Sequence, residues 1–261
     1  MKTVLSIAGT DPSGGAGIQA DLKTIEAHGL YGMAAVTAVI AQNTTGVYAM
    51  QAVSPELVAK QIDCVFEDIR PDAVKLGMLY SAEIIYTVAE RLCAHHAKNV
   101  VLDPVLISSS GHTLSCANAL PVMMEHILPL CTLITPNLHE VSAMTGRSIG
   151  TRAEMEQAAR QLALCTNGGI LIKGGHLADC ADDLLYNDGG LHWLHAPRIE
   201  NPNTHGTGCT LSSSIACNLA LGVSLSGSVK RAKRYLTACI QFGLDLGHGP
   251  GPLQHRVEWE E

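Results

Sequence analysis

Residues 205–210 of the chain read His-Gly-Thr-Gly-Cys-Thr and lead directly into a helix-compatible run, Leu211 to Leu221. Glycines allow the backbone to turn sharply, so that several N–H groups point toward one spot. The helix that begins here adds the positive end of its dipole to the same spot. The stretch therefore predicts an anion hole built from Gly206, Thr207 and Gly208 at a helix start.

Cys209 lies at the start of this predicted helix, where a thiol ionises most readily. A free cysteine has a pKa of about 8.5, and helix N-termini and nearby cations can lower it to roughly 3.5–7.5. We therefore expect Cys209 to act as a base or nucleophile beside a hole that stabilises negative charge. The same residues also fit a plain glycine loop that caps a helix, with Cys209 as a small packing residue.

Size and composition favour one α/β domain. The 261 residues are enough for a single large core, although length alone also permits two small domains. The sequence is 47% hydrophobic, 16% charged and 4% aromatic, which suits a parallel sheet covered on both faces by alanine-rich helices. Neither a Pro- or Ser-rich linker nor an internal repeat divides it, so we expect one domain over residues 1–261.

Charge and cysteine usage restrict the partners and the compartment. The formal net charge of -7 argues against a nucleic-acid partner, because phosphate backbones require a basic face. The nine cysteines are scattered singly without metal-ligand spacing, which is typical of reduced thiols in a cytoplasmic protein. The apolar start is too short for a signal peptide, and the longest apolar run, residues 33–41, is far below membrane-spanning length. We expect no membrane partner.

Short apolar runs alternate with longer helical patterns over the first two thirds of the chain. Strands are predicted over residues 4–8, 35–40, 73–76, 100–102, 133–135 and 170–173. Helices are predicted over residues 18–28, 55–67, 83–94, 117–128 and 152–164. This alternation predicts a mostly parallel sheet with right-handed crossovers, whose functional residues lie at the carboxyl ends of the strands.

The alternation stops after Lys173. Residues 184–187 and 191–195 are separated by Asp-Gly-Gly and predict a late β-hairpin. Two helices are then expected over most of residues 207–246, followed by a non-helical tail that contains Gly-Pro-Gly-Pro.

A glycine-rich loop, residues 9–17, follows the first predicted strand. Within it the pattern G-x-G-x-x-A over residues 15–20 matches the dinucleotide-binding fingerprint, so an NAD or FAD enzyme is one interpretation. That fingerprint expects an acidic residue about 20 positions further on, and residues 27–53 contain none. We therefore interpret the loop as a wall where a ligand approaches the backbone, with Asp11 as a polar contact; a turn that serves packing alone is the alternative.

Three charged residues end or follow predicted strands and should meet at one edge of the sheet. Lys173 precedes Gly174 and Gly175, so its ammonium can reach a transferring phosphate, unless it simply leaves the sheet for solvent. Asp103 and Glu140 offer carboxylate oxygens, which suit Mg²⁺ held through water and substrate phosphates. Either acid could instead be structural, and Glu140 in particular would suit the first turn of a helix.

Eight segments in the same order, spread over essentially the whole chain, resemble one enzyme family: residues 9–24, 38–44, 75–78, 103–105, 135–140, 173–176, 205–213 and 247–252. They resemble the hydroxymethylpyrimidine/phosphomethylpyrimidine kinases of thiamin biosynthesis, which are ribokinase-like enzymes. The resemblance implies a three-layer α/β/α sandwich and a homodimer. It also implies ATP- and Mg²⁺-dependent phosphorylation of 4-amino-5-hydroxymethyl-2-methylpyrimidine and then of its monophosphate.

The same resemblance assigns roles to individual residues. Asp103 and Glu140 would hold the metal, and the pyrimidine pocket would be lined by Gly9, Ala16, Gln42, Met78 and Val105. The amide of Gln42 offers both a donor and an acceptor to an aminopyrimidine edge. Our hypothesis is that Cys209 takes the proton of the substrate hydroxyl, while the anion hole and Lys173 stabilise the charge on the phosphates.

Cys209 also narrows the choice of substrate. Most ribokinase-like sugar and pyridoxal kinases carry an aspartate at this position, so the cysteine favours the pyrimidine kinases. A group of similar cysteine-bearing kinases that act on pyridoxal is the alternative. A non-catalytic nucleotide-binding protein would be expected to lack Lys173, Cys209 or an acid, and all are present. Residues 108–114 are expected to form a mobile lid.

Overall fold

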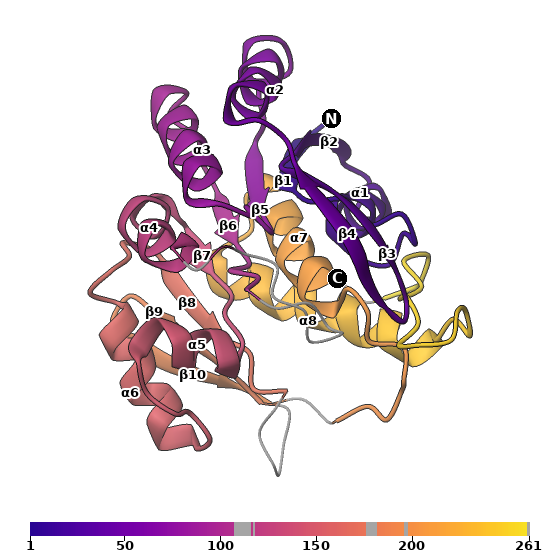
Figure 1. Ribbon diagram of the computed structural model, residues 1–261. Helices are drawn as coiled ribbons and strands as arrows, with labels where there is room; N and C mark the ends of the chain where they lie inside the picture. The colour runs from indigo at the N-terminus through magenta and orange to yellow at the C-terminus, as the bar shows by residue number, and fades with distance from the viewer. Residues whose placement is uncertain (107–115, 117, 176–181, 196–197, 260–261) are drawn as a thin grey trace.

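The computed structural model describes residues 1–106, 116, 118–175, 182–195 and 198–259 (Figure 1). Its main sheet has eight strands in the order β10-β9-β8-β7-β6-β5-β1-β2. These are β1 (Thr3–Ala8), β2 (Tyr31–Val36), β5 (Ala73–Leu76), β6 (Val100–Leu102), β7 (Leu133–Ile134), β8 (Gly169–Ile172), β9 (Asp183–Asn187) and β10 (Gly190–Leu194). Within this sheet β2, β1, β5, β6, β7 and β8 pair in parallel. β9 and β10 form an antiparallel hairpin beside β8. The mostly parallel sheet with a late hairpin is confirmed.

Helices cover both faces of this sheet (Figure 1). One face packs against α2 (Pro55–Asp68), α3 (Ala82–Ala94), α4 (Ala119–His126), α5 (Leu138–Thr145) and α6 (Arg152–Leu162). The other packs against α1 (Gly17–Ala27), α7 (Thr207–Ala220) and α8 (Leu225–Phe242). Because successive strand residues point to opposite faces, Leu5 of β1 belongs to the first core and Val4 to the second. The expected three-layer α/β/α sandwich is confirmed.

The region after β2 differs from the predicted single strand over residues 35–40. The main-sheet strand ends at Val36, and β3 (Ala38–Asn43) and β4 (Gly46–Ala52) then form a separate antiparallel hairpin. Thr37 lies between β2 and β3, and its buried hydroxyl donates to the carbonyl of Met78, 2.7 Å away. A continuous apolar run does not reveal where a chain leaves one sheet for another, which explains the error.

Two smaller features also bear on the site. The predicted helix over residues 117–128 is shorter, because α4 ends at His126 and a 3₁₀ turn, Leu128–Leu130, contains a proline. The helix α5 was not predicted as an element of its own. The predicted lid, residues 108–114, lies outside the described residues.

The tail after α8 is non-helical, as expected, and it connects two parts of the molecule. The N–H groups of His248 and Gly249 donate to the hydroxyl of Thr44 at the tip of the β3–β4 hairpin, each over 3.2 Å. Further on, the carbonyl of Gly251 accepts a hydrogen bond from the N–H of His205, 3.1 Å away. In the described part of the chain, none of the helices combines the length and apolar character needed to cross a membrane.

Candidate active site

A cavity of about 890 Å³ gathers most of the residues singled out in the sequence. Its lining includes Gly9, Ala16, Gln42, Met78, Asp103, Val105, Glu140, Lys173 and all four residues from Gly206 to Cys209. These residues come from the loops after β1, β5, β6 and β8, from β3, and from the first turns of α5 and α7. As expected for a parallel sheet, the cavity lies at the carboxyl ends of the strands.

The anion hole depends on close backbone packing at Gly206. This residue has a φ of 86°, in the left-handed region, and a Cβ atom there would lie 1.9 Å from the carbonyl oxygen of Gly15. Gly206 is also the N-cap of α7, so no side chain caps the first turn of that helix. The N–H of Thr207 donates to the carbonyl of Thr204 over 3.3 Å. Within the described residues the N–H groups of Gly208 and Cys209 have no backbone acceptor outside the helix, so they are available to an anion.

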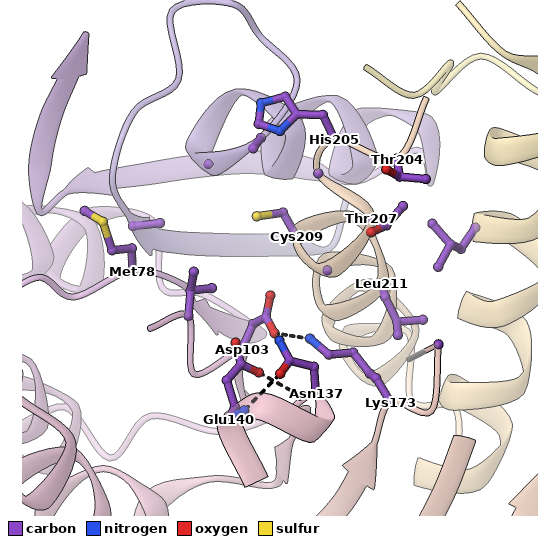
Figure 2. Close-up of a pocket in the computed structure, with 18 of the residues that line it drawn as sticks. Met78, Asp103, Asn137, Glu140, Lys173, Thr204, His205, Thr207, Cys209 and Leu211 are labelled. Carbon is purple, nitrogen blue, oxygen red and sulfur yellow. Dashed lines mark hydrogen bonds and ion pairs between the residues drawn. The ribbon is translucent and has the colours of Figure 1, made fainter. Parts of the chain in front are cut away.

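The start of α7 faces a lysine–aspartate pair (Figure 2). A Cβ atom at Gly208 would lie 2.9 Å from Asp103 Oδ2 and 3.4 Å from Lys173 Nζ. Lys173 Nζ itself lies 2.6 Å from Asp103 Oδ1. Figure 2 shows Cys209 projecting from the same turn toward the side of the cavity that holds Met78. The structure thus brings the loop, the lysine and the acid into one cleft.

The ammonium of Lys173 stays charged in this setting. Burial by itself lowers the pKa of Lys173, but the carboxylates of Asp103 and Glu140 raise it above the usual lysine value. Asp103 also accepts a longer hydrogen bond, 3.3 Å, from the hydroxyl of Thr135. A positive charge therefore lies opposite the predicted anion hole.

Glu140 combines the two roles that the sequence left open. Its carboxylate accepts a hydrogen bond from the N–H of Asn137, 2.7 Å away, and completes a capping box at the start of α5. It also lines the cavity. Burial raises the pKa of Glu140 to about 7, Lys173 opposes this rise and Asp103 adds to it. The residue therefore changes charge near neutral pH.

The acids fit a magnesium ion that is held mainly by its substrate. Among the described residues, no group of three or more His, Cys, Asp or Glu side chains could hold a metal. Mg²⁺ commonly takes one or two carboxylates and fills its remaining positions with water and phosphate oxygens. Asp103 and Glu140 provide two such carboxylates on one wall of the cavity, so the donor set fits this mode of binding.

The ionised thiol that the sequence predicts at position 209 is wrong for this structure. Removal from water raises the pKa of Cys209 to about 11, although the positive charge of Lys75 lowers it. The loss of hydration outweighs the helix start and the nearby cations. At neutral pH the side chain is therefore a thiol and not a thiolate.

The predicted contact between Asp11 and substrate does not fit the placement of this residue either. Asp11 is fully buried and does not belong to the cavity lining. Its carboxylate accepts hydrogen bonds from the N–H groups of Ser13 (2.9 Å) and Ala16 (2.8 Å), and His205 Nε2 lies 2.8 Å away. Burial raises the pKa of Asp11, but the hydrogen bonds to His205 and Ser13 outweigh this effect and hold the pKa below its usual value. Asp11 therefore shapes the glycine-rich loop and links it to the loop before α7.

Sequence reasoning missed a second lysine–aspartate pair beside the cavity. Lys75 lines the cavity and lies 2.8 Å from Asp21 of α1, and both side chains are fully buried. The available signal was the lysine in the middle of the buried strand Ala73–Leu76, a position where charges are rare.

Comparison with known proteins assigns the family. The profile described as phosphomethylpyrimidine kinase matches residues 11–254. The chain belongs to the phosphomethylpyrimidine kinase family. The hydroxymethylpyrimidine/phosphomethylpyrimidine kinase of Streptomyces coelicolor is 47% identical over 252 residues, which is 97% of this chain and 93% of that protein. The thiamine biosynthesis bifunctional protein ThiED of Geobacter sulfurreducens is 45% identical over 260 residues, and the chain spans 99% of its own length but 53% of ThiED.

Solved structures agree with the family and the fold. The phosphomethylpyrimidine kinase of Clostridium difficile 630 superimposes with a TM-score of 0.82 at 41% identity, over 91% of this chain and 98% of that one. An ADP complex of Bacillus subtilis pyridoxal kinase superimposes with a TM-score of 0.91 at 34% identity, over 98% of both chains. This member of the phosphomethylpyrimidine kinase family is therefore a ribokinase-like phosphotransferase, and the resemblance seen in the sequence is confirmed.

Proposed function

We propose that the chain transfers the γ-phosphoryl group of ATP to the hydroxymethyl oxygen of 4-amino-5-hydroxymethyl-2-methylpyrimidine. It then phosphorylates the resulting monophosphate to the diphosphate, as part of thiamin biosynthesis. The observation that carries this proposal is that the glycine turn of α7 faces the Lys173–Asp103 pair in the same cavity as a group of apolar side chains. The names of the relatives supply the substrate class.

The apolar side of the cavity is suited to a small flat ring. Met78 and Val105 pack together with the buried Ile40 of the hairpin. A Cβ atom at Gly9 would lie 2.7 Å from the terminal methyl group of Met78, so glycine keeps this wall open. The Nε2 atom of Gln42 makes a long contact of 3.5 Å to the carbonyl of Thr10. An aminopyrimidine edge would give this amide a better hydrogen-bond partner. Ala16 of the glycine-rich loop lines the same cavity.

The polar side is suited to phosphates. In our proposal the N–H groups from Gly206 to Cys209 hold the charge that develops on the transferred group, and Lys173 neutralises the phosphate oxygens. Asp103 and Glu140 would hold Mg²⁺ through water and nucleotide oxygens. When bound, this ion would supply further neutralisation of the phosphate charge.

In our proposal Cys209 receives the substrate proton. In the proposed step the hydroxymethyl oxygen forms a bond to the γ-phosphorus, and the bond from that phosphorus to ADP breaks. ADP leaves with the electron pair, and the hydroxyl proton passes to the Cys209 thiolate. Because the thiol has a pKa of about 11, the thiolate is the minor form that performs this step. In the second phosphorylation the nucleophile is a phosphate that is already largely ionised, so the base matters less.

Mass detection of products tests the proposal. Purified chain with MgATP should convert the pyrimidine alcohol first to its monophosphate and then to its diphosphate, and should turn over pyridoxal more slowly. Cys209→Ala should slow the first phosphorylation by about 10²-fold and the second by much less. Cys209→Ser keeps a polar group of similar size and serves as the matched variant. Equal losses in both steps would remove Cys209 as the base, and preferred turnover of pyridoxal would favour a pyridoxal kinase.

We also propose that residues 1–261 act as one kinase domain, as a homodimer in the cytoplasm, without a nucleic-acid or membrane partner. The formal net charge of -7 supports the absence of a nucleic-acid partner. Sedimentation of the purified chain tests the dimer, and a mass of 27.6 kDa in solution would contradict it.

A further inference from the structure

The buried pair Lys75–Asp21 has no role in the function proposed above. Both side chains are fully buried, and Lys75 Nζ lies 2.9 and 2.8 Å from the two carboxylate oxygens of Asp21. Such a pair is costly to remove from water, and a hydrophobic replacement of similar volume is often equally stable. Stability alone therefore does not explain why this pair lies at the wall of the cavity.

Further hydrogen bonds join Asp21 to the helix that carries Cys209. The hydroxyl of Ser6, the cross-strand neighbour of Lys75, donates to Asp21 Oδ2 over 2.6 Å. The hydroxyl of Ser213 donates to Asp21 Oδ1 over 2.8 Å. Ser213 lies four residues after Cys209 in α7, so the two residues share one side of that helix. The network therefore fixes Lys75 relative to the turn that holds the sulfur.

The ammonium of Lys75 has a donor that the pair does not use. Lysine carries three N–H donors, and two of them are accounted for by the oxygens of Asp21. Within the described residues, no other group accepts a hydrogen bond from Nζ. Gly77 provides the space, because a Cβ atom there would lie 2.8 Å from Nζ. Lys75 and Cys209 line the same cavity, and the positive charge of Lys75 acts on the thiol of Cys209.

We propose that Lys75, oriented by Asp21, is a positioning residue that stabilises negative charge on the sulfur of Cys209 during proton transfer. The inference rests on the proposed function for the identity of the substrate. In the step described above, the proton moves from the hydroxymethyl oxygen to the sulfur, and Lys75 keeps its own protons throughout. Its contribution is to increase the small fraction of thiolate that can accept the proton.

Four charged residues act on the sulfur: Lys75, Asp21, Asp103 and Lys173. After the effect of burial, the attraction of Lys75 is the largest contribution to the pKa of Cys209, and it lowers that pKa. Repulsion from Asp21 raises the pKa of Cys209 by less than Lys75 lowers it, and repulsion from Asp103 raises it by less still. Removal of the whole Lys75–Asp21 pair should therefore make the thiol less acidic, even though the net charge of the pair is zero.

Alkylation of Cys209 tests this without any turnover. The full chain is treated with iodoacetamide at pH 9, and fragment ions separate Cys209 from the buried Cys217. Lys75→Met leaves the charge of Asp21 unpaired in the interior and can prevent folding. The alkylation rate of the unmodified chain is therefore compared with that of the double variant Asp21→Asn/Lys75→Met, which removes both charges. We expect alkylation of Cys209 to be about threefold slower in the folded double variant, and about tenfold slower in Lys75→Met where it folds, since one pKa unit is tenfold.

Two controls accompany the measurement. Alkylation of the exposed Cys64 is the internal reference and should not change. Lys2→Met is the matched variant, because it removes a lysine that lies 2.7 Å from an aspartate, Asp72, in an exposed pair. It should leave the alkylation rate of Cys209 as it is.

The sign of the change separates an electrostatic role from a structural one. A variant that merely loosens the pocket exposes Cys209 and speeds its alkylation, whereas loss of the Lys75 charge slows it. A rate in the folded double variant equal to or above that of the unmodified chain overturns the inference. Turnover supplies a second readout: the double variant should lower kcat for the first phosphorylation, and should no longer do so in a Cys209→Ala background. If the chain phosphorylates no pyrimidine, the proposed function fails and alkylation still decides the role of Lys75.

Discussion

Two lysine–aspartate pairs border the same cavity, and they differ in what surrounds the carboxylate. Asp21 is fully buried and accepts hydrogen bonds from Ser6 and Ser213 as well as from Lys75. Asp103 holds Lys173 through Oδ1, and Thr135 adds a longer bond to the same oxygen. No described residue donates a hydrogen bond to Oδ2 of Asp103, which faces Gly208.

This difference separates a fixed charge from an exchangeable one. A buried carboxylate with all its acceptors occupied has nothing to gain from a ligand, and breaking its bonds leaves an uncompensated charge. A carboxylate with a vacant oxygen at a cavity wall can exchange partners when phosphates and a cation arrive. We therefore expect the Lys75–Asp21 pair to set the electrostatics of the site and the Lys173–Asp103 pair to bind the ligand.

The largest expected effect is on stability, at the fixed pair. Lys75→Met should lower the free energy of unfolding by about 3–5 kcal/mol, because the charge of Asp21 is left buried and unpaired. Urea unfolding followed by circular dichroism measures the loss. Asp21→Asn/Lys75→Met removes both charges and should recover most of it. If the double variant is as unstable as the single one, packing of the lysine stem and not its charge holds the region together.

At the Lys173–Asp103 pair, loss of the lysine should affect activity more than stability. Lys173→Met should lower kcat for both phosphorylations by about 10²–10³-fold, since it removes a group that stabilises transferred charge. Its unfolding free energy should fall by less than that of Lys75→Met, because Lys173 is 17% exposed and water can reach its partner from the cavity. Steady-state kinetics and urea unfolding of the same preparation provide both numbers. A kcat within tenfold of the unmodified chain would show that Lys173 only holds Asp103.

The sequence predicted the layers of this fold better than the point at which the chain leaves the main sheet for the β3–β4 hairpin. Strand–helix alternation was sufficient for the parallel sheet, because each buried strand is short and is followed by a helix with one apolar face. It was insufficient around Thr37, where one apolar run serves both the main sheet and the separate β3–β4 hairpin. Pairing partners decide that boundary, and they lie elsewhere in the chain.

The site shows the same limit. Residues that follow strands, such as Asp103 and Lys173, were predictable because parallel strands end at one edge. The network of Lys75 was not, because Asp21 lies 54 positions away in the sequence, on helix α1, and only the packing of that helix brings it to Lys75. The acidity of Cys209 was predicted in the wrong direction for a related reason: the helix start is visible in the sequence, whereas the loss of hydration depends on the assembled cavity.

The smallest expected effect is in the pH dependence of the first phosphorylation. It depends on both lysine–aspartate pairs, because the charges of both act on Cys209. A base acts in its deprotonated form, and the pKa of Cys209 is about 11, above the working range. Between pH 8 and 9.5, above the range in which Glu140 titrates, the thiolate fraction grows about tenfold per pH unit. The kcat/KM of the first step should therefore rise with pH by up to about tenfold per unit, and the second step should rise much less.

Variants of Lys75–Asp21 and of Cys209 test whether ionisation of Cys209 causes this pH dependence. Asp21→Asn/Lys75→Met should keep the slope and lower every point by the factor that alkylation measures, because the thiol is less acidic but still the base. Cys209→Ala should abolish the slope. A flat profile in the unmodified chain would mean that ionisation of Cys209 does not limit the reaction. Catalysis would then depend on the glycine turn and Lys173, with the sulfur as a filler of the pocket.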